Sequence, residues 1–176
     1  MERECNPRRA CRGLTLVELL VALAVLAVLL GLAAPSFGRI AAGQRASAAV
    51  NTLVASFQQA RMRALARAGH VGLCPSSDGL ACSGGLGWHR GWLGWDDLDG
   101  DRRLDPDEPI HARHEALPEG VAVTSSVGRP RLHYGPDGSA DGSNLTLTVC
   151  LAQAPGLGRV VVVNNAGRPR TGPAAC

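Results

Sequence analysis

Residues 8–37 read RRACRGLTLVELLVALAVLAVLLGLAAPSF and decide how the rest of the chain is arranged. A basic leader ends at Gly13, and residues 14–34 are almost wholly apolar, with Glu18 as their only ionisable side chain. At a rise of about 1.5 Å per residue, a helix of this length spans a bilayer hydrocarbon core of ~30 Å. Backbone polar groups in a bilayer need partners within their own segment, so we expect a transmembrane helix over 14–34.

Glu18 is the unusual residue of this segment. A carboxylate in the hydrocarbon core costs roughly 2.5–3.5 kcal/mol, so Glu18 needs a partner or a role. If the chain is cut after Gly13, the new α-amino group of Leu14 lies one helical turn from Glu18. An amine–carboxylate pair, within a subunit or between neighbours, would neutralise both charges and set the register between packed helices.

Gly13 followed by Leu-Thr-Leu-Val-Glu and an apolar helix resembles the N-terminal signal of type IV pilins and pseudopilins. The resemblance implies that prepilin peptidase cleaves after Gly13, that Leu14 is N-methylated, and that Glu18 guides assembly with other pilins. Two alternatives are an ordinary secretory signal with a cleavage site at 31–33 and an uncleaved membrane anchor with Glu18 near the interface. Neither alternative explains Gly13 and Glu18 together.

The charge of the chain predicts its topology better than its ligands. The formal net charge is +3, and all 18 residues counted as Lys or Arg are arginines. The leader carries four of these arginines and two glutamates, which leaves the remainder near +1. Global charge therefore does not argue for nucleic acid, and only a local arginine cluster would. The basic leader predicts a cytoplasmic N-terminus in the bacterial inner membrane and a periplasmic C-terminal domain.

The cysteines predict disulfides. Two fall in the leader and four in the rest of the chain: Cys5 and Cys11, then Cys74, Cys82, Cys150 and Cys176. An even number in an oxidising compartment indicates disulfide bonds, with three possible connectivities. We favour Cys74–Cys82, which closes a short Ser/Gly loop, and Cys150–Cys176, which ties the last segment to a strand. Zinc is the alternative, but the chain has no CxxC or Cys–His pair at metal spacing.

The helical pattern resumes after Pro35 and stops at Gly69. Apolar residues recur there with a period of about 3.6, which indicates an amphipathic helix. These residues are Ile40, Ala41, Ala48, Val50, Leu53, Val54, Phe57, Ala60, Ala64, Leu65 and Ala68. The polar positions between them are Gln44, Arg45, Asn51, Gln58, Arg61, Arg63 and Arg67.

From His70 onward, short apolar runs alternate with clusters of turn residues, which is typical of strands. The expected strands are 71–74, 91–95, 109–113, 120–124, 131–134, 145–151 and 159–164. We therefore predict an α+β, type IV pilin-like fold, in which a long N-terminal helix packs on an antiparallel sheet. Its parts are the leader (1–13), the transmembrane half (14–34) and the amphipathic half (35–69) of the helix, and the β domain (70–176).

The tail holds the first candidate site. The last expected strand is followed by the turn Asn-Asn-Ala-Gly and then by Arg168 and Arg170 on a short return segment. Residues two apart on an extended chain point the same way, so the two guanidiniums form a fork suited to phosphate oxygens. Such a fork binds nucleic acid without sequence preference. From the spacing alone, a solvated turn is the simpler interpretation. Three further arginines widen the patch if the fold brings them near: Arg129, Arg131 and Arg159.

The tail also resembles the FimT branch of the GspH/FimT minor pilins, in which a Gly-Arg-x-Arg motif binds DNA during natural transformation. Gly167, Arg168 and Arg170 match that motif position by position. The resemblance implies a non-catalytic, minor pilin-like subunit of a type IV pilus that binds DNA for uptake. The alternative is a GspH-type minor pseudopilin, a structural tip component of a type II secretion system.

An acidic turn is the second candidate site. Asp97, Asp99 and Asp101 have the spacing of calcium ligands, but Arg102 stands where an EF-hand loop needs glycine. Aspartates are also ordinary turn formers, so a calcium site and a plain turn both remain open. The nearby Trp88, Trp92 and Trp95 are expected to pack on the helix or cover the sheet. The sequence has no GxSxG, P-loop or HExxH motif, so we expect neither an enzyme nor a cofactor.

Overall fold

The first helix, α1 (Leu16–Arg67), is continuous in the computed structural model. The structure describes residues 15–140 and 142–176, with the backbone alone for 32–37, 39 and 155. Thr15 caps the helix, because its Oγ1 accepts a hydrogen bond from the Glu18 N–H (3.2 Å). The helix ends where Ala68 turns to a φ of 48°. The predicted leader, its cleavage site at Gly13 and Leu14, and the cysteines Cys5 and Cys11 lie outside the described residues.

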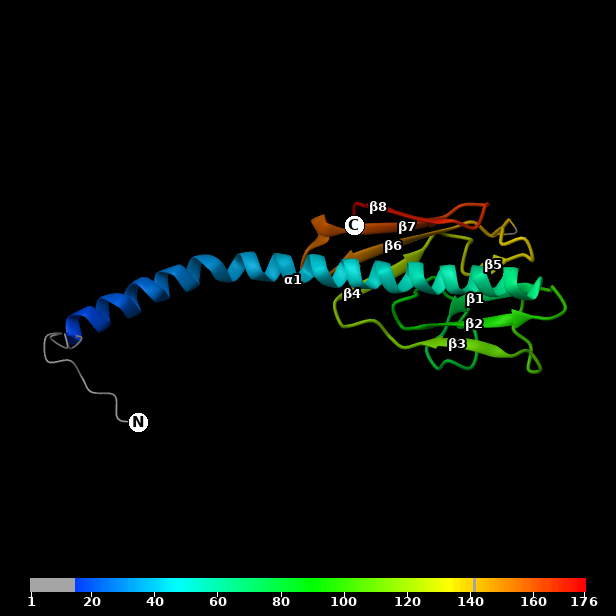
Figure 1. The fold of residues 1–176 in the computed structure, drawn as a ribbon, viewed down its shortest axis with the longest axis horizontal. Coiled ribbons are helices and arrows are strands. Elements are labelled where there is room, and N and C mark those ends of the chain that lie inside the picture. The colour runs from blue at the N-terminus through cyan, green and yellow to red at the C-terminus, as the bar shows by residue number, and fades with distance from the viewer. Residues whose placement is uncertain (1–14, 141) are drawn as a thin grey trace, which may run out of the picture. The chain divides into compact units, whose positions relative to one another are not determined.

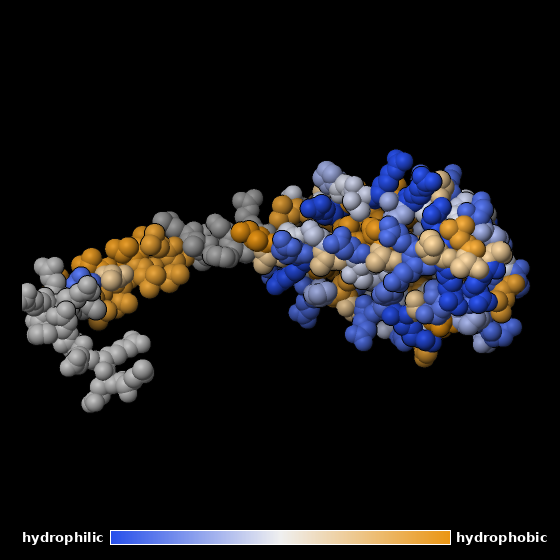
Figure 2. Space-filling view, viewed as in Figure 1, coloured by the Kyte–Doolittle hydropathy of each residue, from blue (hydrophilic) through white to orange (hydrophobic). Residues whose placement is uncertain are grey.

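The chain divides into two compact units, residues 1–39 and residues 40–176. In the first unit, the described side chains of α1 are exposed and almost all apolar, as the orange surface in Figure 2 shows. Within the part of the chain that the structure describes, no helix is both long and apolar enough to cross a membrane. The predicted span over 14–34 is therefore not confirmed.

The second unit combines the rest of α1 with two antiparallel sheets (Figure 1). The first sheet has the order β3-β2-β1-β5 and the second the order β4-β6-β7-β8. The strands are β1 (His70–Pro75), β2 (Trp92–Asp97), β3 (Ile110–His114), β4 (Val121–Ser125), β5 (Leu132–Tyr134), β6 (Leu145–Leu151), β7 (Arg159–Val163) and β8 (Pro169–Pro173). A short 3₁₀ turn, η1 (Pro155–Leu157), precedes β7. The predicted α+β fold is confirmed, but the single expected sheet is in fact two.

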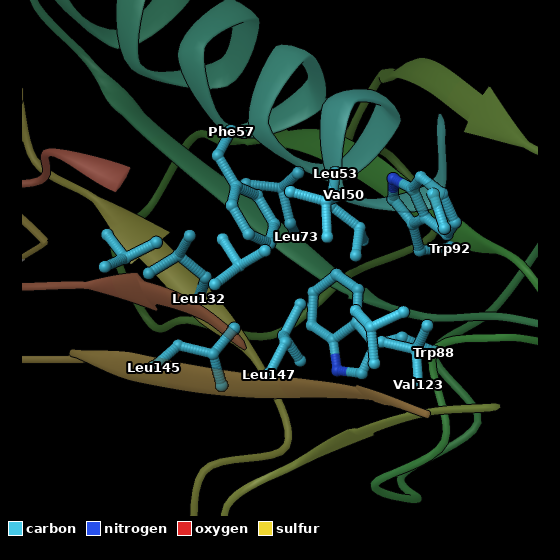
Figure 3. Packing of buried hydrophobic residues seen from close by; sticks show 14 of the residues in the cluster. Val50, Leu53, Phe57, Leu73, Trp88, Trp92, Val123, Leu132, Leu145 and Leu147 are labelled. Carbon is cyan, nitrogen blue, oxygen red and sulfur yellow. The ribbon is translucent and has the colours of Figure 1, made fainter. Parts of the chain in front are cut away.

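One face of α1 forms the centre of the core. Its buried residues are Ala42, Ala46, Ala49, Val50, Leu53, Ser56, Phe57, Ala60 and Ala64. Phe57 and Leu53 point at Leu73 of the first sheet and at Leu145 and Leu147 of the second (Figure 3). The predicted stripe is therefore right along part of its length only. The structure leaves several of its members exposed: Ile40, Ala41, Ala48, Leu65 and Ala68.

The three tryptophans are fully buried and lie in two different places. Trp88 meets Phe57 edge to face, with ring centroids 5.8 Å apart. The Trp92 Nε1–H donates to Ser56 Oγ on the helix (3.2 Å). Trp95 belongs to a separate cluster with Leu93 and Cys74, and its Nε1–H donates to the Arg103 carbonyl (3.0 Å). Trp88 and Trp92 therefore pack on the main core, whereas Trp95 packs away from it.

Both predicted disulfides are confirmed, Cys74–Cys82 and Cys150–Cys176. The first closes a loop of short sequence separation at the end of β1, and the second joins β6 to the C-terminus. Both lie within residues 40–176, as do all the buried core residues of the described chain. The second unit therefore contains what it needs to fold as a separate domain.

A buried carboxylate ties α1 to the first sheet. The Asp96 side chain in β2 is almost fully buried and accepts two hydrogen bonds from Arg63, from Nε (2.5 Å) and from a terminal nitrogen (2.8 Å). Arg67 lies 3.7 Å from the same carboxylate. The hydrogen bond from Arg63 holds the pKa of Asp96 below its usual range. A lowered pKa in the folded state stabilises the fold above the unfolded-state pKa, and this stabilisation is lost as pH falls.

This linkage makes a pH-dependent prediction for Asp96→Asn in residues 40–176. At pH 6 the variant should be less stable than the parent by about 1–3 kcal/mol, because the ionised partner of Arg63 is gone. At pH 3 the difference should shrink, because Asp96 of the unfolded parent binds a proton below its ordinary pKa and the stabilisation by the ionised form is progressively lost. Urea unfolding at both pH values measures it, with the exposed Asp99→Asn as control. An Asp96→Asn deficit of equal size at both pH values would contradict the linkage.

Candidate functional site

The tail reverses direction through a tight turn fixed by Asn164. The Gly167 N–H donates to the Asn164 carbonyl (2.8 Å), and the Arg168 N–H donates to its side-chain Oδ1 (3.1 Å). After the turn the chain pairs with β7 as strand β8, with Val162 opposite Arg170. The sequence predicted this segment as a return of the chain, and the structure makes it a strand of the second sheet.

Gly167 occupies a position that only glycine fits. Its φ is +73°, in the left-handed region, and the residue is buried. A Cβ built on it would overlap the Gly138 carbonyl oxygen and lie 3.0 Å from the Tyr134 ring. The glycine of the Gly-Arg-x-Arg sequence is therefore required by close packing on the loop 135–140, in addition to its backbone conformation.

Helix α1 holds the same loop. The Arg61 Nε–H donates to the Gly138 carbonyl (2.8 Å), and the Ala140 N–H donates to the carbonyl of Asn165 in the turn (2.8 Å). The Gly138 carbonyl is thus the point at which helix, loop and tail meet. These contacts fix the place from which Arg168 projects.

Arg168 and Arg170 are both exposed, but they have different neighbours. Arg168 precedes β8 and lines an open groove of about 520 Å³ beside α1. Arg170 stands opposite Val162, which is opposite Thr146. Val161 and Val163 face the core, so alternation along the strand puts Arg170 on the outer face of the second sheet. The predicted fork of the two guanidiniums stays a prediction.

The other predicted arginines have contacts or a strand face of their own. Arg159 begins β7 and stands opposite Pro173, so it has the opposite face parity to Val162 and Arg170. A terminal nitrogen of Arg129 donates to the Gly142 carbonyl (2.6 Å), and one of Arg131 donates to the Arg102 carbonyl (2.8 Å).

The fold places Arg61 in the lining of the groove, which contains none of these three arginines. Sequence reasoning treated it only as a polar helix position, and no local pattern links it to a loop 77 residues away.

The acidic turn is ordered by its own backbone. Asp97 accepts N–H bonds from Gly100 (2.8 Å) and Arg102 (3.1 Å), and Asp99 accepts one from Asp101 (3.0 Å). Arg102 has a φ of 68°, the left-handed conformation for which a calcium loop uses glycine.

Carboxylate oxygens in this turn gather in two groups of three, Asp97, Asp99 and Glu108, and Asp99, Asp101 and Asp105, each within 4.8 Å. Glu108 and Asp105 were not among the predicted ligands. Calcium binding at Asp97, Asp99 and Asp101 stays a prediction, because turn formation by itself explains the backbone N–H bonds to Asp97 and Asp99.

A serine–histidine contact in the described residues has a structural explanation. Ser56 Oγ lies 3.1 Å from His114 Nε2, which is the geometry of a nucleophile and its base. However, Ser56 is only 3% exposed, donates to the Thr52 carbonyl (2.8 Å) and accepts from Trp92. A hydroxyl so enclosed has no room for a substrate, and the contact serves the packing of α1 on β2 and β3.

Comparisons with known proteins find similar sequences and similar structures. Residues 49–167 match the family described as Type II transport protein GspH, and residues 8–34 match the prokaryotic N-terminal methylation motif. The pilin-like protein PilA1 of Thermus thermophilus is 34% identical over 166 residues, which cover 90% of this chain and 97% of PilA1.

Two solved structures share the fold. The type IV minor pilin FimU of Pseudomonas aeruginosa has a TM-score of 0.59 at 17% identity, over 76% of this chain and 93% of FimU. The minor pseudopilin EpsH from the type 2 secretion system of Vibrio cholerae has a TM-score of 0.51 at 12% identity, over 73% of this chain and 97% of EpsH.

The packing of Gly167 predicts a stability difference between two glycine variants of residues 40–176. Gly128 also has a positive φ (+76°), but a Cβ there would meet nothing within 4 Å. Gly128→Ala should therefore cost only the backbone term, about 1–2 kcal/mol. Gly167→Ala should cost about 1–3 kcal/mol more, because the loop 135–140 must move. Urea unfolding of both variants measures the difference, and equal losses would show that the tail is not packed on Gly138.

Proposed function

Because the chain belongs to the Type II transport protein GspH family of minor pilins and pseudopilins, we propose that it is a non-catalytic minor subunit of a type IV pilus that binds DNA through Arg168 and Arg170. The observation that carries the proposal is the exposure of these two arginines next to Gly167, whose packing fixes their backbone. Arginine binds phosphate oxygens through two parallel N–H bonds, so the ligand is the DNA backbone and not its bases. Arg159, whose face parity is opposite to that of Arg170, is not part of this proposed surface.

We further propose that the N-terminus follows the pilin pathway. The methylation motif over residues 8–34 supports cleavage by prepilin peptidase after Gly13, methylation of Leu14 and an assembly role for Glu18 among other pilins. The apolar residues 14–34 would anchor the subunit in the bacterial inner membrane before assembly. The two disulfides support an oxidising periplasmic environment for residues 40–176.

A GspH-type role in a type II secretion pseudopilus is the second candidate. The observation in its favour is the fold shared with EpsH, a minor pseudopilin of such a system. In that role the C-terminal unit would contact other pseudopilins and would have no affinity for DNA. The two candidates share their N-terminal processing, so only the surface of the C-terminal unit separates them.

DNA binding by residues 40–176 tests the first proposal. Fluorescence anisotropy with duplexes of unrelated sequence should give similar affinities that fall steeply with salt. Arg168→Ala combined with Arg170→Ala should weaken binding at least about tenfold and reduce the salt slope by about 2, one per lost phosphate contact. The control is Arg45→Ala with Arg90→Ala, two exposed arginines whose removal changes the net charge equally. If the parent does not bind at low salt, or the control pair weakens binding as much, the secretion role is favoured.

Processing is tested separately in cells that contain a prepilin peptidase. Mass spectrometry of the membrane-extracted protein should show a chain that begins at a methylated Leu14. Gly13→Val should leave the leader attached, because a bulky residue blocks the scissile position. Ala10→Val, three residues upstream, is the control and should still be cut. An unprocessed parent protein would remove the basis for a pilin-type assembly route.

A further inference from the structure

We propose that the groove beside Arg168 holds a second segment of the DNA backbone, so that the bound strand runs from β8 across helix α1. The groove is lined by Gln58, Arg61, Met62, Arg168 and Pro169. The proposal rests on DNA binding by the tail, and it goes beyond the Gly-Arg-x-Arg sequence by assigning a phosphate contact to the helix.

The helix presents one continuous face to this groove. Gln58, Arg61 and Met62 stand at i, i+3 and i+4, which places them on the same side of α1. Gln58 and Met62 are exposed, Met62 at 61%, whereas the neighbouring Phe57 and Ala60 are buried in the core. The groove therefore lies on an accessible side of a helix whose opposite side is fixed by packing.

The charge of the groove suits a phosphate chain. Two guanidiniums, Arg61 and Arg168, line it together with the neutral amide of Gln58. Arg61 uses its Nε–H for the Gly138 carbonyl, and a guanidinium has four further N–H donors. Met62 and Pro169 add apolar surface of the kind that packs against deoxyribose. The groove thus offers cations for phosphates and apolar contacts for sugars side by side.

An acidic residue, Asp137, directly precedes Gly138, whose carbonyl accepts the hydrogen bond from Arg61. The pKa of Asp137, in the loop 135–140, is lowered chiefly by the N–H of Ser139, and the positive charge of Arg61 adds to the effect. Asp137 is exposed, so it places a negative charge near the proposed path of the phosphates. Its removal should therefore strengthen binding.

The Arg61 guanidinium and the backbone of the tail are also held in place before any ligand arrives. Arg61 is bonded to the Gly138 carbonyl, and Gly167 packs on that same carbonyl. A shared anchor therefore fixes the tail backbone that carries Arg168 relative to the Arg61 guanidinium. Such preorganisation lowers the entropy lost on binding, which favours simultaneous contacts by both residues.

Two adjacent glutamines offer a matched test in the full chain, purified in a non-ionic detergent. Gln58 lines the groove and Gln59 does not, although both are exposed on α1. Gln58→Glu should weaken binding of a 30-base-pair duplex at 0.15 M salt at least about fivefold, because it sets a carboxylate against phosphates. Gln59→Glu should change it less than about twofold, since salt screens a charge directed away from the groove. Equal effects of the two variants would overturn the proposed path.

Two substitutions should raise the affinity for DNA. Such a gain cannot result from misfolding, because a misfolded variant would bind more weakly. Met62→Lys adds a cation to the groove and should tighten binding about twofold to fivefold, whereas Leu98→Lys, at an equally exposed apolar site outside the groove, should not. Asp137→Asn should also tighten binding.

The failures of the two proposals are distinguishable. A parent chain that does not bind, or one indifferent to loss of Arg168 and Arg170, overturns both the proposed function and the groove. A chain that depends on those arginines but not on residues 58 and 62 overturns the groove alone.

Discussion

The structure depends on the burial of one face of α1 between Ala42 and Ala64. Alanines dominate that face, and their small side chains let both sheets approach the helix closely, while Leu53 and Phe57 fill the centre. Successive helix residues point about 100° apart, so the residues of a single turn can contact several different parts of the fold. Ala60 and Ala64 enter the core, Arg63 binds Asp96 of the first sheet, and Arg61 binds the loop under the tail. The placement of the candidate site thus follows from the packing of the helix.

Much of this fold can be predicted from the sequence, because the patterns that indicate strands, helices and disulfides are largely local. The alternation in 145–151 predicted β6 at its observed bounds. The short loop between Cys74 and Cys82 predicted one disulfide, and the remaining pair, which ties the last segment to a strand, predicted the other. The split into two sheets was not predicted, since no local pattern says which strand pairs with which. The prediction of the buried helix face was only partly right, because alanine occurs both in cores and on surfaces. Ala42 and Ala46 are buried only because the strands happen to lie against them.

The candidate site shows the same division. Gly167, Arg168 and Arg170 are recognisable from their order in the chain, but the reason for the glycine is a contact with Gly138 that only the fold reveals. No local sequence pattern indicates a role for Arg61. It is linked to the tail only by its hydrogen bond to the Gly138 carbonyl, in a loop 77 residues later. Functional positions that depend on tertiary contacts are the ones a single sequence cannot supply.

The fold alone does not decide between a pilus and a secretion machine, since FimU and EpsH share it at 17% and 12% identity. The edge of the second sheet bears on this choice. An outer strand such as β8 exposes backbone groups to which a neighbouring chain can pair. Pro169 and Pro173 remove N–H donors from that strand, and Arg170 between them adds a charge. These features oppose strand addition by another subunit while leaving the arginines accessible. An edge that opposes strand addition and carries cations suits an anionic polymer, which agrees with the DNA-binding role proposed for Arg168 and Arg170.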